Sequence, residues 1–209
     1  MVSQTVSNLI FLNQNAVSLV AQGKTLAALR LLQSALHATM ENVRQRHAGC
    51  GNSQFMIQPI EVATANEEPF SPHNAFRVFG RLFLMTEAIT DPDEVALVLL
   101  YNFALTLQIQ GLATGKNHLL RKSLNVYGWI GHMVAQNHGI PTPDFKLLLL
   151  ALSMNQGYLH SHFVCFSQAQ KCASRIHELL NHSFDLPMET LLFFHQSVIH
   201  VDFSLAPTA

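Results

Sequence analysis

Two asparagines in apolar stretches are the residues of this chain best suited to hold a ligand. Asn102 lies in VLLYNFALTLQ and Asn155 lies in ALSMNQGYL, each two residues before a small residue, Ala104 or Gly157. A carboxamide donates and accepts hydrogen bonds at once, so it can pair with both groups of a peptide backbone. The same side chains could instead join neighbouring helices from inside, because a buried amide needs an internal partner. The sequence leaves both interpretations open.

Histidine and cysteine, the usual ligands of zinc, do not show a metal-binding spacing in this chain. There are 12 His and 3 Cys. His160 and His162 are two residues apart and would point to different faces of a helix. His47 and Cys50 lack a second pair at zinc-ribbon spacing. We therefore expect no metal site and no other cofactor.

Catalytic motifs are also missing from the sequence. It has no Walker loop, no GxSxG, no HExxH and no paired-glycine dinucleotide turn. The GLATG run at Gly111–Gly115 is too short for a phosphate-binding loop and fits a turn. We predict a protein without enzymatic activity, and the remote alternative is an unrecognised site at His132, His160 or His162.

Three pairs of amphipathic helices are expected to position the asparagines. The first helix of each pair carries a small residue where it would cross the second, which is Ala16, Ala104 or Gly157. The third predicted helix stops at Gly111, and the sixth starts at Gln168. The predicted hairpins span about 6–43, 92–137 and 143–181, within a single domain of residues 1–209.

Capping residues mark the ends of several of these helices. Asp91 and Thr142 are good N-caps, and each is followed by a proline, which suits the first helical turn. Gly23 follows the first helix, at the position where a left-handed cap favours glycine.

The region between the first and second pairs, about 47–90, has two runs with the composition of strands. These runs are FMIQPIEVA, within 54–63, and AFRVFGRLFLM, at 75–85. They predict a β-hairpin near 54–85. The C-terminal run LLFFHQSVIHVDF, within 189–203, is rich in large apolar and β-branched residues. It predicts a third strand near 190–202 in the same antiparallel sheet.

Phenylalanine is concentrated on these predicted strands. The densest set is Phe76, Phe79, Phe83, Phe193 and Phe194, for which a place in the core is the default. An exposed edge of this sheet would instead be a docking site for a partner strand or a second copy. The candidates for such an edge are Arg77, Phe79, Arg81 and Phe83.

The overall composition excludes several classes of function. Charged residues make up 12% of the chain against 49% hydrophobic residues, a balance opposite to that of disordered proteins. The net charge is -1 and there is no basic stripe, so we expect no nucleic-acid partner. The apolar stretch Val95–Leu107 is shorter than the roughly 18 to 20 residues of a membrane span. With no secretory signal and an odd cysteine count, we expect a soluble cytoplasmic protein.

The helix pairs resemble a degenerate tetratricopeptide repeat over roughly 90 residues. The first pair matches best, with Ala16 at the small crossing position and Gly23 at the turn. None of the pairs has the Trp or the terminal Pro of the full pattern. The other matching positions are Leu19, Ala28, Leu32 and Ala35 in the first pair, Ala104, Leu107 and Gly111 in the second, and Gly157, His160 and Ala169 in the third.

Several longer stretches are similar to a large group of uncharacterised tetratricopeptide-like proteins from diatoms. They are SPHNAF with RLFLM, VLLYNFALTLQIQGL, ALSMNQGYLHSHF and the C-terminal FF with LAPTA. This similarity extends over most of the chain. It implies helical hairpins with strands and carries no known activity.

The tetratricopeptide resemblance implies a concave groove lined by the first helix of each pair. Our candidates for its lining are Asn13, Tyr101, Asn102, Gln108, Asn155 and His160. A carboxylate-binding groove is not expected, because the relevant positions carry no Lys or Arg.

The sequence therefore predicts a mainly α-helical protein with three tetratricopeptide-like hairpins and a small antiparallel β-sheet. We expect a non-enzymatic interaction or scaffold module that binds a peptide or helix of a partner protein in its groove, with little dependence on salt. The alternative is a structural protein that forms a homodimer or larger homo-oligomer through the sheet edge.

Overall fold

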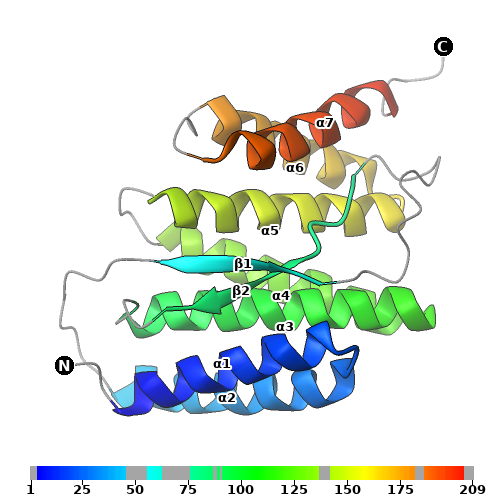
Figure 1. Ribbon diagram of the computed structural model, residues 1–209. Helices are drawn as coiled ribbons and strands as arrows, with labels where there is room; N and C mark the ends of the chain where they lie inside the picture. The colour runs from blue at the N-terminus through cyan, green and yellow to red at the C-terminus, as the bar shows by residue number, and fades with distance from the viewer. Residues whose placement is uncertain are drawn as a thin grey trace. The chain divides into compact units, whose positions relative to one another are not determined.

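The computed structural model describes residues 4–45, 56–62, 76–86, 89, 91–136, 142–181 and 186–204. Within these residues the chain forms seven α-helices and a two-stranded antiparallel β-sheet (Figure 1). The predicted class, mainly helical with a small sheet, is confirmed. The chain divides into two compact units: unit 1 comprises Met1–Asn66 and Gly80–His138, and unit 2 comprises Glu67–Phe79 and Gly139–Ala209.

Unit 1 contains four helices, and consecutive helices pack on each other. Its central helix is apolar on almost every side, and all but one of the residues from Val95 to Ile109 are buried. The helices are α1 (Gln4–Ala21), α2 (Thr25–Gln45), α3 (Pro92–Thr114) and α4 (Asn117–Gln136).

α3 is long and apolar enough to cross a membrane between Asp93 and Thr114. However, 78% of its most apolar window is buried inside the protein. A core helix passes the same test of length and composition, so this helix is weak evidence for a membrane span.

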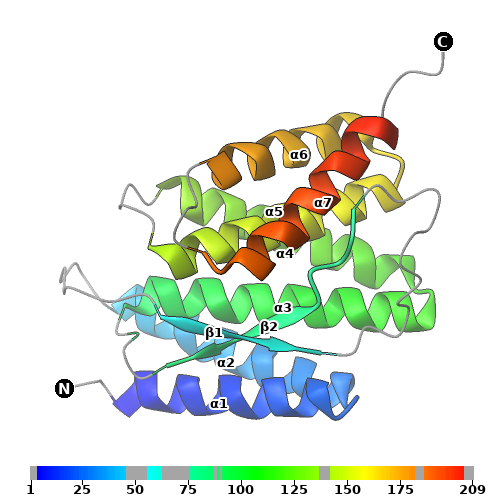
Figure 2. The ribbon, with the colours of Figure 1, turned by 45° about the horizontal axis from the view of Figure 1, so that its top comes forward.

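The sheet of unit 1 consists of β1 (Ile57–Glu61) and β2 (Arg81–Met85), and β2 packs against α1 and α3 (Figures 1 and 2). The predicted hairpin is confirmed for these residues, whereas 54, 55, 63 and 75 lie outside the described part of the chain. Pro59 pairs with Phe83, two residues from the pair of Glu61 with Arg81.

Alternation along the ladder determines the direction of the backbone groups of Phe83. The N–H of Val62 donates to the carbonyl of Gly80 at 3.0 Å, so hydrogen-bonded pairs fall on the even-numbered residues of both strands. Phe83 and Pro59 are therefore a non-hydrogen-bonded pair. The N–H and C=O of Phe83 point away from β1, and the missing N–H of Pro59 costs the ladder nothing.

Unit 2 contains three helices, α5 (Pro143–His162), α6 (Phe166–Asn181) and α7 (Met188–Ser204). α5 packs on α6 and α6 packs on α7. The expected N-cap of α5 is present, because the Thr142 hydroxyl accepts a hydrogen bond from the N–H of Phe145 at 3.3 Å.

The first helix of each pair ends in the same type of backbone cap. The N–H of Lys24 donates to Leu19 O at 2.8 Å, and that of Lys116 to Gly111 O at 3.0 Å. The residue before each donor is a glycine in the left-handed region, Gly23 or Gly115. The third helix, α5, has the same bond from Cys165 to His160 O at 2.7 Å.

Val164 occupies the left-handed position in the cap of α5, with φ of 61°. A β-branched side chain is strained there, by roughly 1–2 kcal/mol relative to a right-handed conformation. We expect Val164→Gly to stabilise the protein by about 1 kcal/mol, because the side chain is 66% exposed and contributes little packing. Urea unfolding measures this change. A loss of stability in Val164→Gly relative to Val164→Ala would contradict the prediction.

The C-terminal strand predicted near 190–202 is wrong, because Met188–Ser204 form α7. The apolar and β-branched composition is compatible with a helix when one face is covered. Thr190, Phe193 and Phe194 are half-buried or buried, at the spacing of a helix face. Tertiary packing therefore outweighs the strand propensity of the segment.

Two predicted helix boundaries also differ from the structure. α3 continues past Gly111 to Thr114. Gly111 is therefore not a helix end but a point where α3 and α4 approach closely. A Cβ atom at Gly111 would lie 2.5 Å from Cδ2 of Leu120 on α4. α6 begins at Phe166, two residues before the predicted start at Gln168.

Candidate functional site

Asn13 and Asn102 together bind both backbone groups of Phe83 in unit 1. Oδ1 of Asn102 accepts a hydrogen bond from the N–H of Phe83 at 2.8 Å, and Nδ2 of Asn102 donates to its carbonyl at 2.7 Å. The same Nδ2 donates to Oδ1 of Asn13 at 2.7 Å, while Nδ2 of Asn13 donates to Phe83 O at 3.0 Å. Both asparagines are 0% exposed. We call this arrangement the unit 1 clamp.

The unit 1 clamp covers the edge of β2 that faces away from β1. Phe83 directs its backbone groups to this edge, where a third strand would otherwise bind. Asn102 supplies a donor and an acceptor in place of that strand. The buried N–H and C=O of Phe83 are thereby satisfied, as buried backbone groups must be.

Aromatic rings complete the surroundings of Phe83. Its ring centroid lies 4.8 Å from that of Tyr101, which lies 6.0 Å from that of Tyr127 on α4. The Tyr127 hydroxyl donates to Oε1 of Gln108 at 3.1 Å. Gln108 therefore lies between α3 and α4, and its predicted place in the lining of a groove stays a prediction. Tyr101 does contact the bound segment.

Asn155 forms a second, equivalent clamp in unit 2. Its Oδ1 accepts a hydrogen bond from the N–H of Phe79 at 2.8 Å, and its Nδ2 donates to the carbonyl of Phe79 at 3.3 Å. Asn155 is 0% exposed and Phe79 is 3% exposed. We call this the unit 2 clamp. The residues held by the two clamps, Phe79 and Phe83, are four positions apart in the sequence.

Three phenylalanine rings and a glycine surround the unit 2 clamp. The ring of Phe79 stacks on Phe194 with centroids 5.2 Å apart and meets Phe193 edge to face at 5.7 Å. The ring of Phe76 lies directly over Gly157, so that a Cβ atom there would be 2.3 Å from Cε1 of the ring. Figure 2 shows residues 76–79 beside α5 and α7.

Gly157 was predicted to be small because two helices cross there, and the structure gives it a different neighbour. The glycine makes room for the aromatic ring of Phe76, which lies 81 positions earlier in the chain.

We define the Phe-x-x-Phe site as the four residues that contact Phe76 and Phe79, namely Asn155, Gly157, Phe193 and Phe194. The sequence placed Phe193 and Phe194 on a strand, which is why their place beside Phe79 on a helix was missed.

The four candidates for an open sheet edge do not form one. Phe79 and Phe83 are buried, and both backbone groups of each are bound by asparagines. Arg77 and Arg81 are half-buried. On the other strand, Pro59 has no N–H to offer a partner strand.

His160 lies on α5 with its Nδ1 buried and without a hydrogen-bond partner among the described residues. Burial lowers the pKa of His160, and also that of His162, below the ordinary value of 6.5. The predicted groove role of His160 stays a prediction.

The half-buried His160 predicts a loss of stability in acid. The unfolded chain binds a proton at the ordinary imidazole pKa of 6.5, whereas the folded chain binds it less readily, so acid favours unfolding. We expect the free energy of unfolding to fall as the pH drops below 6.5, with a smaller fall in His160→Gln. Urea titrations at several pH values measure this. Equal slopes in wild type, His160→Gln and the exposed control His132→Gln would contradict it.

The described residues offer little for nucleophilic or metal chemistry. Burial raises the pKa of the Cys172 thiol to about 11, although the Arg175 charge acts in the opposite direction, so this cysteine is protonated at neutral pH. No group of three or more His, Cys, Asp or Glu side chains in the described ranges is close enough to hold a metal ion. The hydrogen-bonding asparagines remain the most specific arrangement of polar groups.

Comparison with known proteins adds nothing to this geometry, because no protein-family model, curated protein or solved structure matches the chain. Any function must therefore be argued from the clamps themselves.

Proposed function

We propose that this chain is a non-enzymatic interaction module with tetratricopeptide-like helix pairs, which binds an extended segment of a partner protein through asparagines on its first helices. The observation that supports it is the two-point hold of Asn102 and Asn155 on the backbone of Phe83 and Phe79. In each case one amide binds the N–H and the C=O of a single residue. This is how an extended peptide is held without regard to its side chains.

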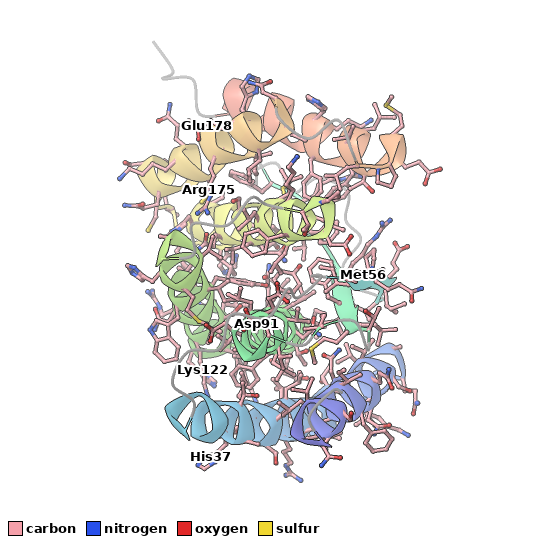
Figure 3. The ribbon with its side chains drawn as sticks, turned by 90° about the vertical axis from the view of Figure 1, so that its left-hand side faces the viewer. His37, Met56, Asp91, Lys122, Arg175 and Glu178 are labelled. Atoms are coloured by element: carbon pink, nitrogen blue, oxygen red, sulfur yellow. The ribbon has the colours of Figure 1, made fainter. Side chains whose placement is uncertain are left out.

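The module is expected to recognise backbone and apolar groups more than charge. The polar atoms of both clamps belong to neutral amides. Charged side chains such as Lys122 of α4 and Glu178 of α6 are exposed on their own helices (Figure 3). Affinity would therefore come from desolvated hydrogen bonds and aromatic contacts, with little electrostatic steering.

Each clamp is occupied by the chain's own backbone, Phe83 in unit 1 and Phe79 in unit 2, where a partner segment would bind. A partner must therefore compete with this backbone, and its apparent affinity is reduced by the fraction of molecules in which the backbone is released. A variant with a weakened resident segment should bind a partner more tightly than the wild type does.

An array of random extended peptides tests this function by comparing wild type with Phe79→Ala. This substitution weakens the binding of the chain's own segment around Phe79. We expect Phe79→Ala to bind a subset of peptides at least about 10-fold more tightly, and the gain to disappear when Asn155→Ala is added. Binding should change by less than about 3-fold between low and moderate salt. The matched control is Ser153→Ala, a buried change on the same helix.

Two results would contradict the proposal. One is the absence of any bound peptide on both proteins, and the other is binding that is unaffected by Asn155→Ala. A steep loss of affinity with salt would instead indicate recognition by charge.

Assembly through the sheet edge is less well supported by the same observations. The outer edge of β2 is taken by asparagines at Phe83, and Pro59 interrupts the donors of β1. Light scattering on the purified chain separates the two functions, and we expect a monomer.

A further inference from the structure

We infer that unit 2 carries a binding site for a partner peptide with two phenylalanines three positions apart, and that Phe76–Phe79 is the exchangeable internal occupant of this site. The inference rests on the proposed function and assigns it a ligand class. It is based on the contacts of the Phe-x-x-Phe site with these four residues.

The first phenylalanine is selected by shape at Gly157. Three atoms of the Phe76 ring lie within 2.6 Å of where a Cβ atom of residue 157 would be. No residue larger than glycine leaves this space, so the position admits a flat ring against the helix backbone. Phe76 is only 3% exposed, which shows how fully the ring is enclosed.

The second phenylalanine is bound by both its backbone and its ring. Asn155 binds its N–H and C=O, and Phe193 and Phe194 contact its ring. The two residues between the phenylalanines, Arg77 and Val78, are half-exposed and thus less enclosed than the two rings. The recognised pattern is therefore Phe-x-x-Phe.

The Phe76–Phe79 segment is easier to release than the segment held in unit 1. Phe83 lies inside β2, is paired with β1 and is bound by two asparagines. Phe76–Phe79 precede β2 and belong to no strand. Release of these four residues leaves the β1–β2 ladder intact, so it costs less than unfolding of the sheet. Exchange with a partner is thus expected at unit 2.

A labelled synthetic peptide with the sequence AFRVFGR, residues 75–81, tests this site on the full-length chain. The protein is Phe76→Ala/Phe79→Ala, in which the internal segment keeps its backbone bonds to Asn155 but loses both ring contacts and competes less strongly. We call this variant the emptied protein. We expect saturable binding by fluorescence anisotropy, at least about 10-fold tighter than to wild type. Addition of Asn155→Ala should lower the affinity for the peptide at least about 10-fold, and addition of Ser153→Ala should leave this affinity unchanged.

Two further variants test the individual contacts. Gly157→Ala in the emptied protein should lower the affinity for the peptide at least about 10-fold. It should not change the affinity for a peptide in which alanine replaces the first phenylalanine. N-methylation of the peptide at the second phenylalanine removes the N–H that Asn155 binds. It should weaken binding at least about 10-fold, whereas N-methylation at the preceding valine should not.

A folded emptied protein that does not bind the peptide would overturn the inference, as would binding that ignores Gly157→Ala and Asn155→Ala. If the emptied protein lacks a cooperative unfolding transition, hydrogen exchange of the wild type decides. Excess peptide should then speed exchange of the Phe79 amide and spare that of Phe83. Unchanged exchange at Phe79 would overturn the inference.

Other outcomes separate the inference from the proposed function. If the array peptides that bind lack Phe-x-x-Phe but still require Asn155, the proposed ligand class is wrong. The proposed function as an interaction module is then still supported. Wild-type dimers that dissociate in Phe76→Ala/Phe79→Ala would assign the site to a second copy of this chain, and would overturn the assignment to a partner protein.

Discussion

Replacement of Asn102 by alanine is expected to destabilise the protein by about 3–5 kcal/mol, measured by urea unfolding. The change removes the acceptor of the Phe83 N–H and the donor to Oδ1 of Asn13, and both groups stay buried. Each buried group left without a partner costs about 1–3 kcal/mol.

Gln108→Met is the matched control for Asn102→Ala, because Gln108 is an equally buried amide on the same helix. Its Nε2 has no partner among the described residues, and its Oε1 binds only the Tyr127 hydroxyl among the bonds found. We expect Gln108→Met to cost less than about 1.5 kcal/mol. Equal losses in both variants would mean that Asn102 contributes only packing, and would contradict the role of the unit 1 clamp.

Gly157→Ala is expected to destabilise the protein by about 1–3 kcal/mol, although alanine normally stabilises a helix relative to glycine. The new Cβ atom would lie 2.3 Å from the Phe76 ring, and two further ring atoms would be within 2.6 Å. The ring must leave its place, which exposes it and weakens the unit 2 clamp next to it. Thermal unfolding of purified variants measures the effect.

Two comparisons isolate the role of the ring. Gly128→Ala on α4 meets no atom within 4 Å and should stabilise the protein by about 0.5–1 kcal/mol. Gly157→Ala in a Phe76→Ala background should be neutral or stabilising, because the space is then free. A loss of stability that persists without the Phe76 ring would rule out this explanation of Gly157.

The amide chemistry of the clamps could be predicted from the sequence, whereas their occupant could not. An asparagine in an apolar stretch must find a donor and an acceptor, and an extended backbone offers both. Asn155, however, bonds to a residue 76 positions away, and Asn13 to one 70 positions away. Local sequence patterns contain no information about contacts between residues so far apart along the chain. Of the two interpretations left open, the internal one agrees with the bond from Asn102 on α3 to Asn13 on α1, but it did not include the backbone of Phe79 and Phe83 as the partner.

The helices, their caps and the β-hairpin follow from local patterns in the sequence. Helical periodicity located the six paired helices, capping residues such as Asp91 and Thr142 set where two of them begin, and strand composition located the hairpin. These features depend on residues within a few positions of one another, so they are written in short stretches of the chain.

The tertiary structure alone decided the rest. It made Met188–Ser204 a helix, because α6 and the Phe79 ring cover one face of that segment and outweigh its strand propensity. It also gave Gly157 an aromatic ring as its neighbour and gave the asparagines an internal ligand. Both outcomes depend on which distant surfaces meet, and that is fixed by burial and hydrogen-bond satisfaction over a whole unit.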